Sequence, residues 1–129
     1  MILSDAEILT RYILEPACGD GAFLKEIVKR YIKEGKNKKL NNNEIAIGLE
    51  KYIFGIELDK IEYEKCIQNL NTLTNELLGN HNIKWNIFNE NTLYQYNKYK
   101  STFDYIVGNP PYIRIHNLDL VTRDFIKEK

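Results

Sequence analysis

EPACGDGAFL, residues 15–24, is the stretch of sequence that decides the fold. A short apolar run at residues 12–14 comes just before it, and Pro16 ends that run because proline cannot continue a central strand ladder. From Ala22 onward, apolar residues recur every four positions and charged residues take the other face, as in an amphipathic helix. The sequence therefore predicts a strand, a glycine loop and a helix that ends at a C-cap, Gly35.

The rest of the chain repeats this alternation of strands and helices. Asp59 is predicted to cap a long helix with an apolar core stripe made of Ile61, Ile67, Leu70, Leu73 and Leu77. The predicted elements after the first helix are a helix over 44–52, a strand over 53–57, a helix over 60–78, strands over 83–88 and 103–107, and a helix from 118. This alternation favours an α/β fold with a mostly parallel sheet flanked by helices.

Composition and charge exclude several classes of protein. The 129 residues are 43% hydrophobic and 28% charged, which suits one globular domain and excludes disorder. Eighteen Lys and Arg balance eighteen Asp and Glu, so no bulk basic field attracts DNA or a membrane. The two cysteines have neither disulfide-framework nor zinc spacing, and we expect no metal site. No apolar run approaches the roughly 20 residues that span a bilayer, and we expect a cytoplasmic protein without membrane contact.

Four segments at the predicted strand ends carry unusual residues. They are residues 15–21, 57–59, 88–93 and 109–112. In parallel α/β sheets the ligands bind at the carboxyl ends of the strands, where these segments lie. The sequence therefore predicts a binding site at this edge of the sheet.

The first two segments can hold a ligand with a ribose. Gly19 and Gly21 have no Cβ and let a ligand approach the backbone, although a tight strand–helix turn explains them equally well. Their spacing matches neither the dinucleotide-binding G-x-G-x-x-G pattern nor a P-loop. Glu57 can accept two hydrogen bonds from a ribose diol, and the alternative is that Glu57 and Asp59 form a helix N-cap pair.

The sharpest motif is Asn109-Pro110-Pro111-Tyr112. Two consecutive prolines restrict the backbone and leave the local carbonyls outside any strand ladder. Such a segment can present Asn109 Oδ1 and the Pro110 carbonyl to one planar amino group, while Tyr112 stacks on the ring that carries it. At the mouth of an α/β sheet, this arrangement favours binding of an aromatic amine.

With these motifs, the chain resembles the S-adenosylmethionine-dependent N6-adenine DNA methyltransferases of bacterial restriction–modification systems. The resemblance is carried by EPACGDGAFL at 15–24, FGIELD at 54–59 and FDYIVGNPPY at 103–112, in the gamma order. It implies a partial Rossmann-like class I methyltransferase fold over residues 1–129, truncated before the later strands and without the target-recognition domain. It further implies S-adenosyl-L-methionine as cofactor, double-stranded DNA as partner, a cognate restriction endonuclease, fused or separate, and a fragment that is inactive alone.

The resemblance also implies roles for individual residues at the cofactor site. The methionine part of the cofactor would be lined by Glu15, Ala17, Gly19 and Gly21, and the ribose hydroxyls would be held by Glu57. Where the family offers an aspartate to the cofactor's adenine, the best match is Asn91, with Asn89 as the alternative. An amide oxygen can still accept that hydrogen bond, without the strengthening effect of a charge.

The resemblance implies that Asn109, Pro110 and Tyr112 form the catalytic pocket for a target adenine flipped out of the duplex. Hydrogen bonds from adenine N6–H to Asn109 and Pro110 would aim the nitrogen lone pair at the methyl group, for direct in-line transfer. Tyr112 would stack on the base.

Three other functions stay open at this point. The Asn-Pro-Pro-Tyr motif is shared with glutamine-N5 methyltransferases and with RNA adenine methyltransferases, and a catalytically inactive cofactor-binding subunit is a further alternative. The first two families tend to carry Asp-x-Gly-x-Gly in the first loop, so Glu-Pro-Ala-Cys-Gly here favours DNA adenine. Fourteen residues precede Glu15, and we expect the family's upstream cofactor-binding segment to be missing or reduced.

Overall fold

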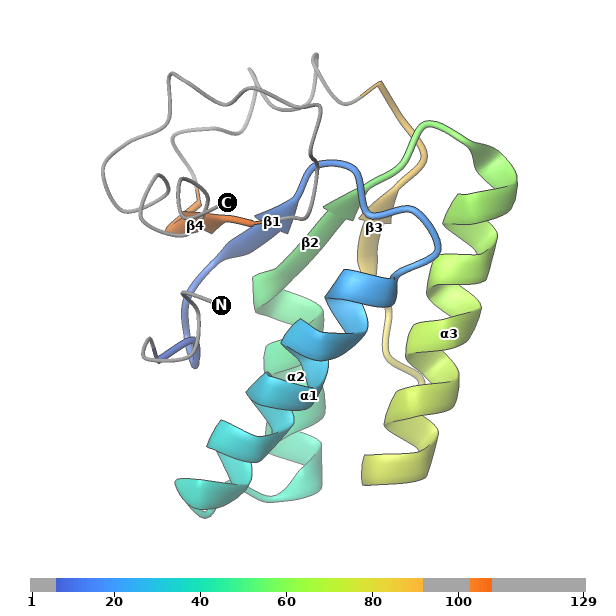
Figure 1. Cartoon of the computed structure of the whole chain (residues 1–129). Coiled ribbons are helices and arrows are strands. Elements are labelled where there is room, and N and C mark those ends of the chain that lie inside the picture. The colour runs from blue at the N-terminus through green and yellow to red at the C-terminus, as the bar shows by residue number, and fades with distance from the viewer. Residues whose placement is uncertain (1–6, 92–102, 108–129) are drawn as a thin grey trace.

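In the computed structural model, which describes residues 7–91 and 103–107, the strands form one parallel sheet (Figure 1). Its order is β3-β2-β1-β4, and each neighbouring pair is parallel. The strands are β1 (Ile13–Glu15), β2 (Ile53–Ile56), β3 (Asn86–Phe88) and β4 (Tyr105–Ile106). Non-consecutive neighbours such as β1 and β4 require crossover connections, as parallel sheets do. The predicted α/β class with a parallel sheet is confirmed.

Three helices of the described part pack against one face of this sheet (Figure 1). They are α1 (Ala22–Asn37), α2 (Asn42–Tyr52) and α3 (Lys60–Leu78), and each contacts the other two. The predicted bounds of α3 and its N-cap are confirmed, since Asp59 Oδ1 accepts a hydrogen bond from Glu62 N at 3.0 Å. The helix predicted from residue 118 lies outside the described residues.

Both faces of the sheet are covered, which explains why apolar residues adjoin along β1 at Ile13 and Leu14 and along β2 from Ile53 to Ile56. Ile13 and Ile53 point toward the helices and belong to the main core. Their neighbours Leu14 and Phe54 point to the opposite face, where a smaller cluster contains Ile56, Phe103 and Ile106. Alternate residues of a strand face opposite sides, so one short strand contributes to two cores.

Gly35 does not end α1 as predicted, because the helix continues to Asn37. The glycine has a different function inside the helix. A Cβ at this position would lie 2.7 Å from Ile45 Cγ1 on α2, closer than real Cβ contacts allow. Gly35 therefore permits a close approach of two helices, which a sequence pattern cannot distinguish from a C-cap.

The prediction that five residues of α3 form its buried core stripe is wrong for two of them. Ile61 is 65% exposed and Leu77 is 39% exposed, whereas Leu70 and Leu73 are buried as predicted and Ile67 is partly buried. The helix buries a face that includes Cys66, Thr74 and Leu78 instead. Ile61 lies in the first turn, at the end of the helix nearest to the predicted binding edge of the sheet.

Element ends differ from the predictions by a few residues, each for a local reason. The first strand is shifted by one residue to 13–15, and the second ends at 56. The helix predicted at 44 begins at 42, because Asn41 and Glu44 form a capping box. The strand predicted over 83–88 is limited to 86–88, since Lys84 N donates to Glu50 Oε1 rather than to a ladder. The strand predicted over 103–107 covers 105–106.

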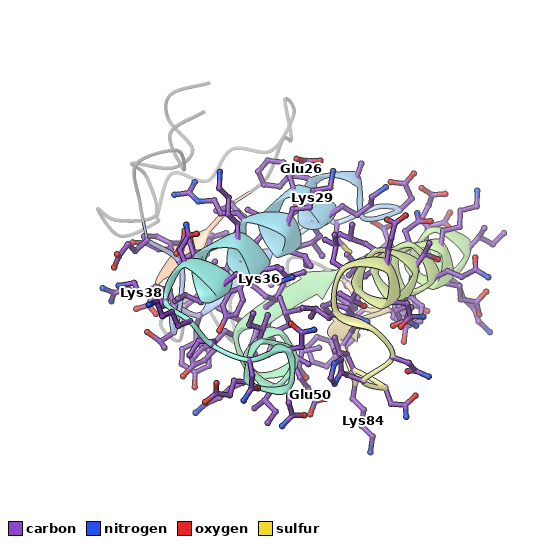
Figure 2. The ribbon with its side chains drawn as sticks, turned by 90° about the horizontal axis from the view of Figure 1, so that it is seen from below. Glu26, Lys29, Lys36, Lys38, Glu50 and Lys84 are labelled. Atoms are coloured by element: carbon purple, nitrogen blue, oxygen red, sulfur yellow. The ribbon has the colours of Figure 1, made fainter. Side chains whose placement is uncertain are left out.

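The last turn of α1 lies at the end of the helix away from the glycine loop (Figure 1), and it carries Lys36, with Lys38 just beyond it (Figure 2). Lys36 Nζ donates to the Leu77 carbonyl at 3.4 Å, and Lys38 pairs with Glu7 at 3.4 Å. The helical rise places Lys36 about 20 Å from Ala22, the first residue of the helix. These lysines therefore connect surface elements away from the predicted binding edge.

In the described ranges, the longest apolar stretches of helix fall short of what crossing a membrane requires.

Candidate functional site

The carboxyl ends of β1, β2 and β3 meet at one edge of the sheet, where the glycine loop joins β1 to α1 (Figure 1). This edge brings together residues 15–21, 57–59 and 89–91, which were predicted from separate parts of the sequence. The segment 109–112 lies outside the described residues, so the roles of Asn109, Pro110 and Tyr112 stay predictions. The described part of the site therefore consists of the strand ends for which the sequence predicts contacts with a cofactor.

The glycine loop is a tight turn that is also tied to β2. Cys18 N donates to the Ile56 carbonyl at 3.0 Å, and Gly21 N donates to the Cys18 carbonyl at 2.9 Å. Gly19 and Gly21 have φ angles of 55° and 89°, in the left-handed region that favours glycine. The backbone therefore forms the tight strand–helix turn that was the alternative explanation of the two glycines. The turn lies at the ends of β1 and β2.

Gly21 is also required by its contact with α3. A Cβ at Gly21 would lie 3.0 Å from Cys66 Sγ and 3.4 Å from Cys66 Cα, whereas a Cβ at Gly19 would meet nothing within 4 Å. We expect Gly21→Ala to lower the free energy of unfolding by about 2–4 kcal/mol, from left-handed strain and overpacking together. Gly19→Ala, which has the strain alone, is the matched control and should cost about 1 kcal/mol. Urea denaturation measures both.

The double variant Gly21→Ala with Cys66→Ala checks the stated cause. Removing Sγ should recover part of the stability that Gly21→Ala loses, because the sulfur is the nearest atom to the added Cβ. Equal losses for Gly19→Ala and Gly21→Ala, or no recovery in the double variant, would contradict the packing explanation.

Glu57 connects the glycine loop to the start of α3. Its Oε1 accepts from Gly19 N at 2.8 Å, and its Oε2 accepts from Asp59 N at 2.9 Å. A carboxylate that supports the start of α3 can also bind a ribose, because each carboxylate oxygen has a second lone-pair site for a further donor. The two interpretations of Glu57 are therefore not exclusive. The bonds fix the carboxylate at the edge of the sheet, and its binding to a ribose stays a prediction.

Asn89 and Asn91 follow β3 in different settings. Asn89 Nδ2 donates to the carbonyls of Glu57 and Leu58, both at 2.8 Å, so its amide hydrogens are used in joining the ends of β2 and β3. Asn91 is exposed. The Asn89 amide thus has a structural role through its hydrogens, and the contact of either asparagine with a cofactor base stays a prediction.

Glu15 is a buried carboxyl group at the end of β1. It is 3% exposed, and the backbone of Ala17 donates a hydrogen bond to it. Burial raises the pKa of Glu15 to about 8 from an ordinary value of 4.5; the Ala17 bond opposes this shift, and the negative charge of Glu57 adds to it. Within residues 7–91 and 103–107, no ion pair involves Glu15. A carboxyl group with this raised pKa holds its proton near neutral pH in the protein without a ligand, and a cationic group placed beside it would favour the carboxylate.

The two cysteines pack behind the loop. Cys18 and Cys66 are both buried, and a hydrogen bond between them, together with burial, raises the pKa of the Cys18 thiol. Thiols in such surroundings are inert. Cys18 and Cys66 therefore act as packing residues.

Sequence reasoning missed several residues beside the site. Leu58 is 65% exposed and, with Ile61, places apolar surface directly after Glu57. Asn69 Nδ2 donates to the Asp20 carbonyl of the glycine loop at 2.8 Å. The sequence could have indicated that Leu58 is exposed, because this apolar residue stands between two acids, Glu57 and Asp59. Nothing in the sequence pattern marked Asn69, because its contact joins segments 49 residues apart.

The described residues offer binding groups of a particular kind. Across these ranges there is no group of three or more His, Cys, Asp or Glu that could hold a metal ion. The edge includes the carboxyl groups of Glu15 and Glu57, exposed apolar surface and a loop without Cβ atoms at Gly19 and Gly21. These suit a ligand with hydroxyl groups, a cationic group and an apolar part.

A match to a known family spans nearly the whole chain. The chain matches the family model described as N-6 DNA Methylase over residues 2–128. It is 29% identical over 133 residues to the type II methyltransferase M.BstVI of Geobacillus stearothermophilus, in an alignment that covers 97% of this chain and 23% of that relative. The chain therefore spans about a quarter of the length of this curated relative.

A solved structure has a similar fold. The cryo-EM structure of the DrdV–DNA complex superposes with a TM-score of 0.61 at 20% identity, over 84% of this chain and 12% of that chain. At this level of identity the likeness concerns the fold. It agrees with a parallel sheet flanked by helices, as in part of a Rossmann-like methyltransferase domain.

Proposed function

The chain belongs to the N-6 DNA methylase family, and on that premise we propose that it forms the cofactor-binding part of an enzyme that methylates N6 of adenine in a specific DNA sequence. The observation that carries the proposal is the edge at which Glu15, Glu57 and the glycine loop meet, in a chain whose family transfers methyl groups. The proposed cofactor is S-adenosyl-L-methionine.

The residues of the edge fit this cofactor. Glu15 is a buried carboxyl without a cationic partner among the described residues, and the cofactor carries an ammonium and a sulfonium group. Glu57 would accept hydrogen bonds from the ribose hydroxyls, and Asn91 from the adenine amino group. Ala17, Gly19 and Gly21 would leave room for the methionine part. When bound, the cofactor supplies an electrophilic methyl group.

The proposed acceptor is an adenine flipped out of duplex DNA. Its amino nitrogen is a poor nucleophile, because the lone pair is delocalised into the ring. Asn109 Oδ1 and the Pro110 carbonyl would accept hydrogen bonds from N6–H and favour a more tetrahedral nitrogen. Tyr112 would stack on the base, an interaction worth about 1–3 kcal/mol per base. These residues orient the acceptor, and none of them is a strong base.

DNA is the proposed partner, within a restriction–modification system that includes a cognate endonuclease, fused or separate. DrdV, a protein of similar fold, has been solved in complex with DNA. The family match supports adenine in DNA over the glutamine and RNA acceptors, and over an inactive subunit.

A direct assay tests the proposed reaction. The complete protein is incubated with labelled S-adenosylmethionine and unmethylated DNA, and the DNA is digested to nucleosides. We expect label in N6-methyladenine. Binding of the cofactor without label in DNA would refute the DNA substrate, and release factor and RNA would then be tested in the same assay.

The cofactor site has its own prediction. Glu57→Gln keeps the size of the side chain but removes the charge and replaces one acceptor oxygen by a donor. We expect cofactor affinity to fall by about ten- to a hundredfold, since hydrogen bonds to charged groups contribute about 1.5–3 kcal/mol. Calorimetry measures the affinity, with Glu64→Gln on the exposed side of α3 as the matched control. Unchanged affinity in Glu57→Gln would refute the assigned role.

A further inference from the structure

Helix α3 forms the rear support of the glycine loop through two residues on one side of the helix. Cys66 lies behind Gly21, with Sγ 3.0 Å from the position that a Cβ would take. One turn later, Asn69 Nδ2 donates to the Asp20 carbonyl at 2.8 Å. Residues three apart on a helix face the same way, so both act on the same part of the loop.

The loop has two halves with different supports. Its first half is tied to β2, through Cys18 N to the Ile56 carbonyl and through Gly19 N to the Glu57 carboxylate. Its second half is tied to α3, through Asn69. The helix is a rigid support, because Leu70, the residue after Asn69, is fully buried.

The bond from Asn69 acts on a peptide unit between two glycines. Gly19 and Gly21 both have positive φ angles, and glycine can adopt several backbone conformations at little cost. Because the peptide unit is planar, fixing the direction of the Asp20 carbonyl also fixes the direction of Gly21 N–H. That N–H donates to the Cys18 carbonyl at 2.9 Å and closes the turn.

We propose that Asn69 is a positioning residue, which holds the Asp20–Gly21 peptide so that the glycine loop keeps the shape that receives the amino-acid part of the cofactor. The inference rests on the proposed function, in which Ala17, Gly19 and Gly21 face that part. Asn69 acts through the loop and does not itself contact the cofactor.

The test compares two ligands in the complete protein. S-adenosylhomocysteine contains the amino-acid part and methylthioadenosine lacks it, while both contain the adenosine. The variant Asn69→Leu keeps the approximate size, adds no charge and removes the donor. We expect it to bind S-adenosylhomocysteine roughly tenfold more weakly, as for loss of one hydrogen bond, and to bind methylthioadenosine as the wild type does.

Two further variants complete the experiment. Gln68→Leu, at the exposed neighbouring position, is the matched control and should leave both affinities unchanged. Asn69→Gln keeps the amide donor and should restore part of the affinity for S-adenosylhomocysteine. In turnover, Asn69→Leu should raise KM for S-adenosylmethionine more than it lowers kcat.

The outcomes separate this inference from the proposed function. If the wild type binds neither ligand, the proposed function fails. If the wild type binds both and Asn69→Leu binds both equally well, the positioning role is refuted. Equal weakening of both ligands in Asn69→Leu, with a lower melting temperature, would show a general structural role and would also refute it.

Discussion

Replacing Asn109 by alanine is expected to reduce methyl transfer to DNA by about a hundred- to a thousandfold, the scale seen when one preorganised polar group is removed from an active site. Cofactor affinity should stay within about twofold of the wild type, because the described cofactor residues come from the ends of β1, β2 and β3. The physical reason is that Asn109 Oδ1 would hold N6–H in the transition state. Radiolabel transfer and calorimetry measure the two quantities in the complete protein.

Asn109→Asp is the matched control for this prediction. It keeps an acceptor oxygen in nearly the same place and should retain more activity than Asn109→Ala. Methylation at the wild-type rate in Asn109→Ala would refute the assigned role. If Asn109→Ala also lost cofactor affinity, Asn109 would instead be a residue that maintains the shape of the cofactor site.

Glu15→Gln is expected to remove a large pH dependence of stability. In the unfolded chain the Glu15 carboxyl ionises near its ordinary pKa of 4.5, whereas burial raises its pKa to about 8 in the folded chain. Its contribution to the free energy of unfolding is therefore fully present below pH 4.5 and is lost as the pH rises to 8. With about 1.4 kcal/mol per pKa unit, the loss is at most about 5 kcal/mol.

Urea denaturation of the wild type and of Glu15→Gln between pH 5 and pH 8 measures this loss. The amide cannot ionise and keeps an oxygen that can accept from Ala17, so the variant should gain stability relative to the wild type as the pH rises. Glu64→Gln removes an exposed carboxyl and should follow the wild type. Parallel curves for the wild type and Glu15→Gln would contradict the burial explanation.

Local sequence patterns predicted the described elements well where their causes are local. The bounds of α3 and the cap at Asp59 are confirmed, since capping and periodicity depend on residues within a few positions. The same patterns failed where the cause lies elsewhere in the fold. Gly35 allows α1 to approach Ile45 on α2 closely. Ile61 is exposed, because the first turn of α3 does not pack on the core at this position.

The site divides in the same way. The sequence placed Glu15, the glycines and Glu57 at one edge, because parallel strands bring their carboxyl ends together. It could not predict that Glu57 would bond to Gly19 N, since that bond depends on the register of β1 against β2. Nor could it predict which asparagine joins the strand ends, because Asn89 and Asn91 are alike in sequence.

By itself, the sequence determined the alternation of strands and helices, the family motifs and the residue types available at the strand ends. Only the tertiary structure decided which of these groups are buried, charged or held in place. Glu15 has its raised pKa because distant segments exclude water from it, and Asp20 is fixed because α3 brings Asn69 within 2.8 Å. Such effects depend on distances through space between residues that are far apart along the chain, and propensity and periodicity carry no information on them.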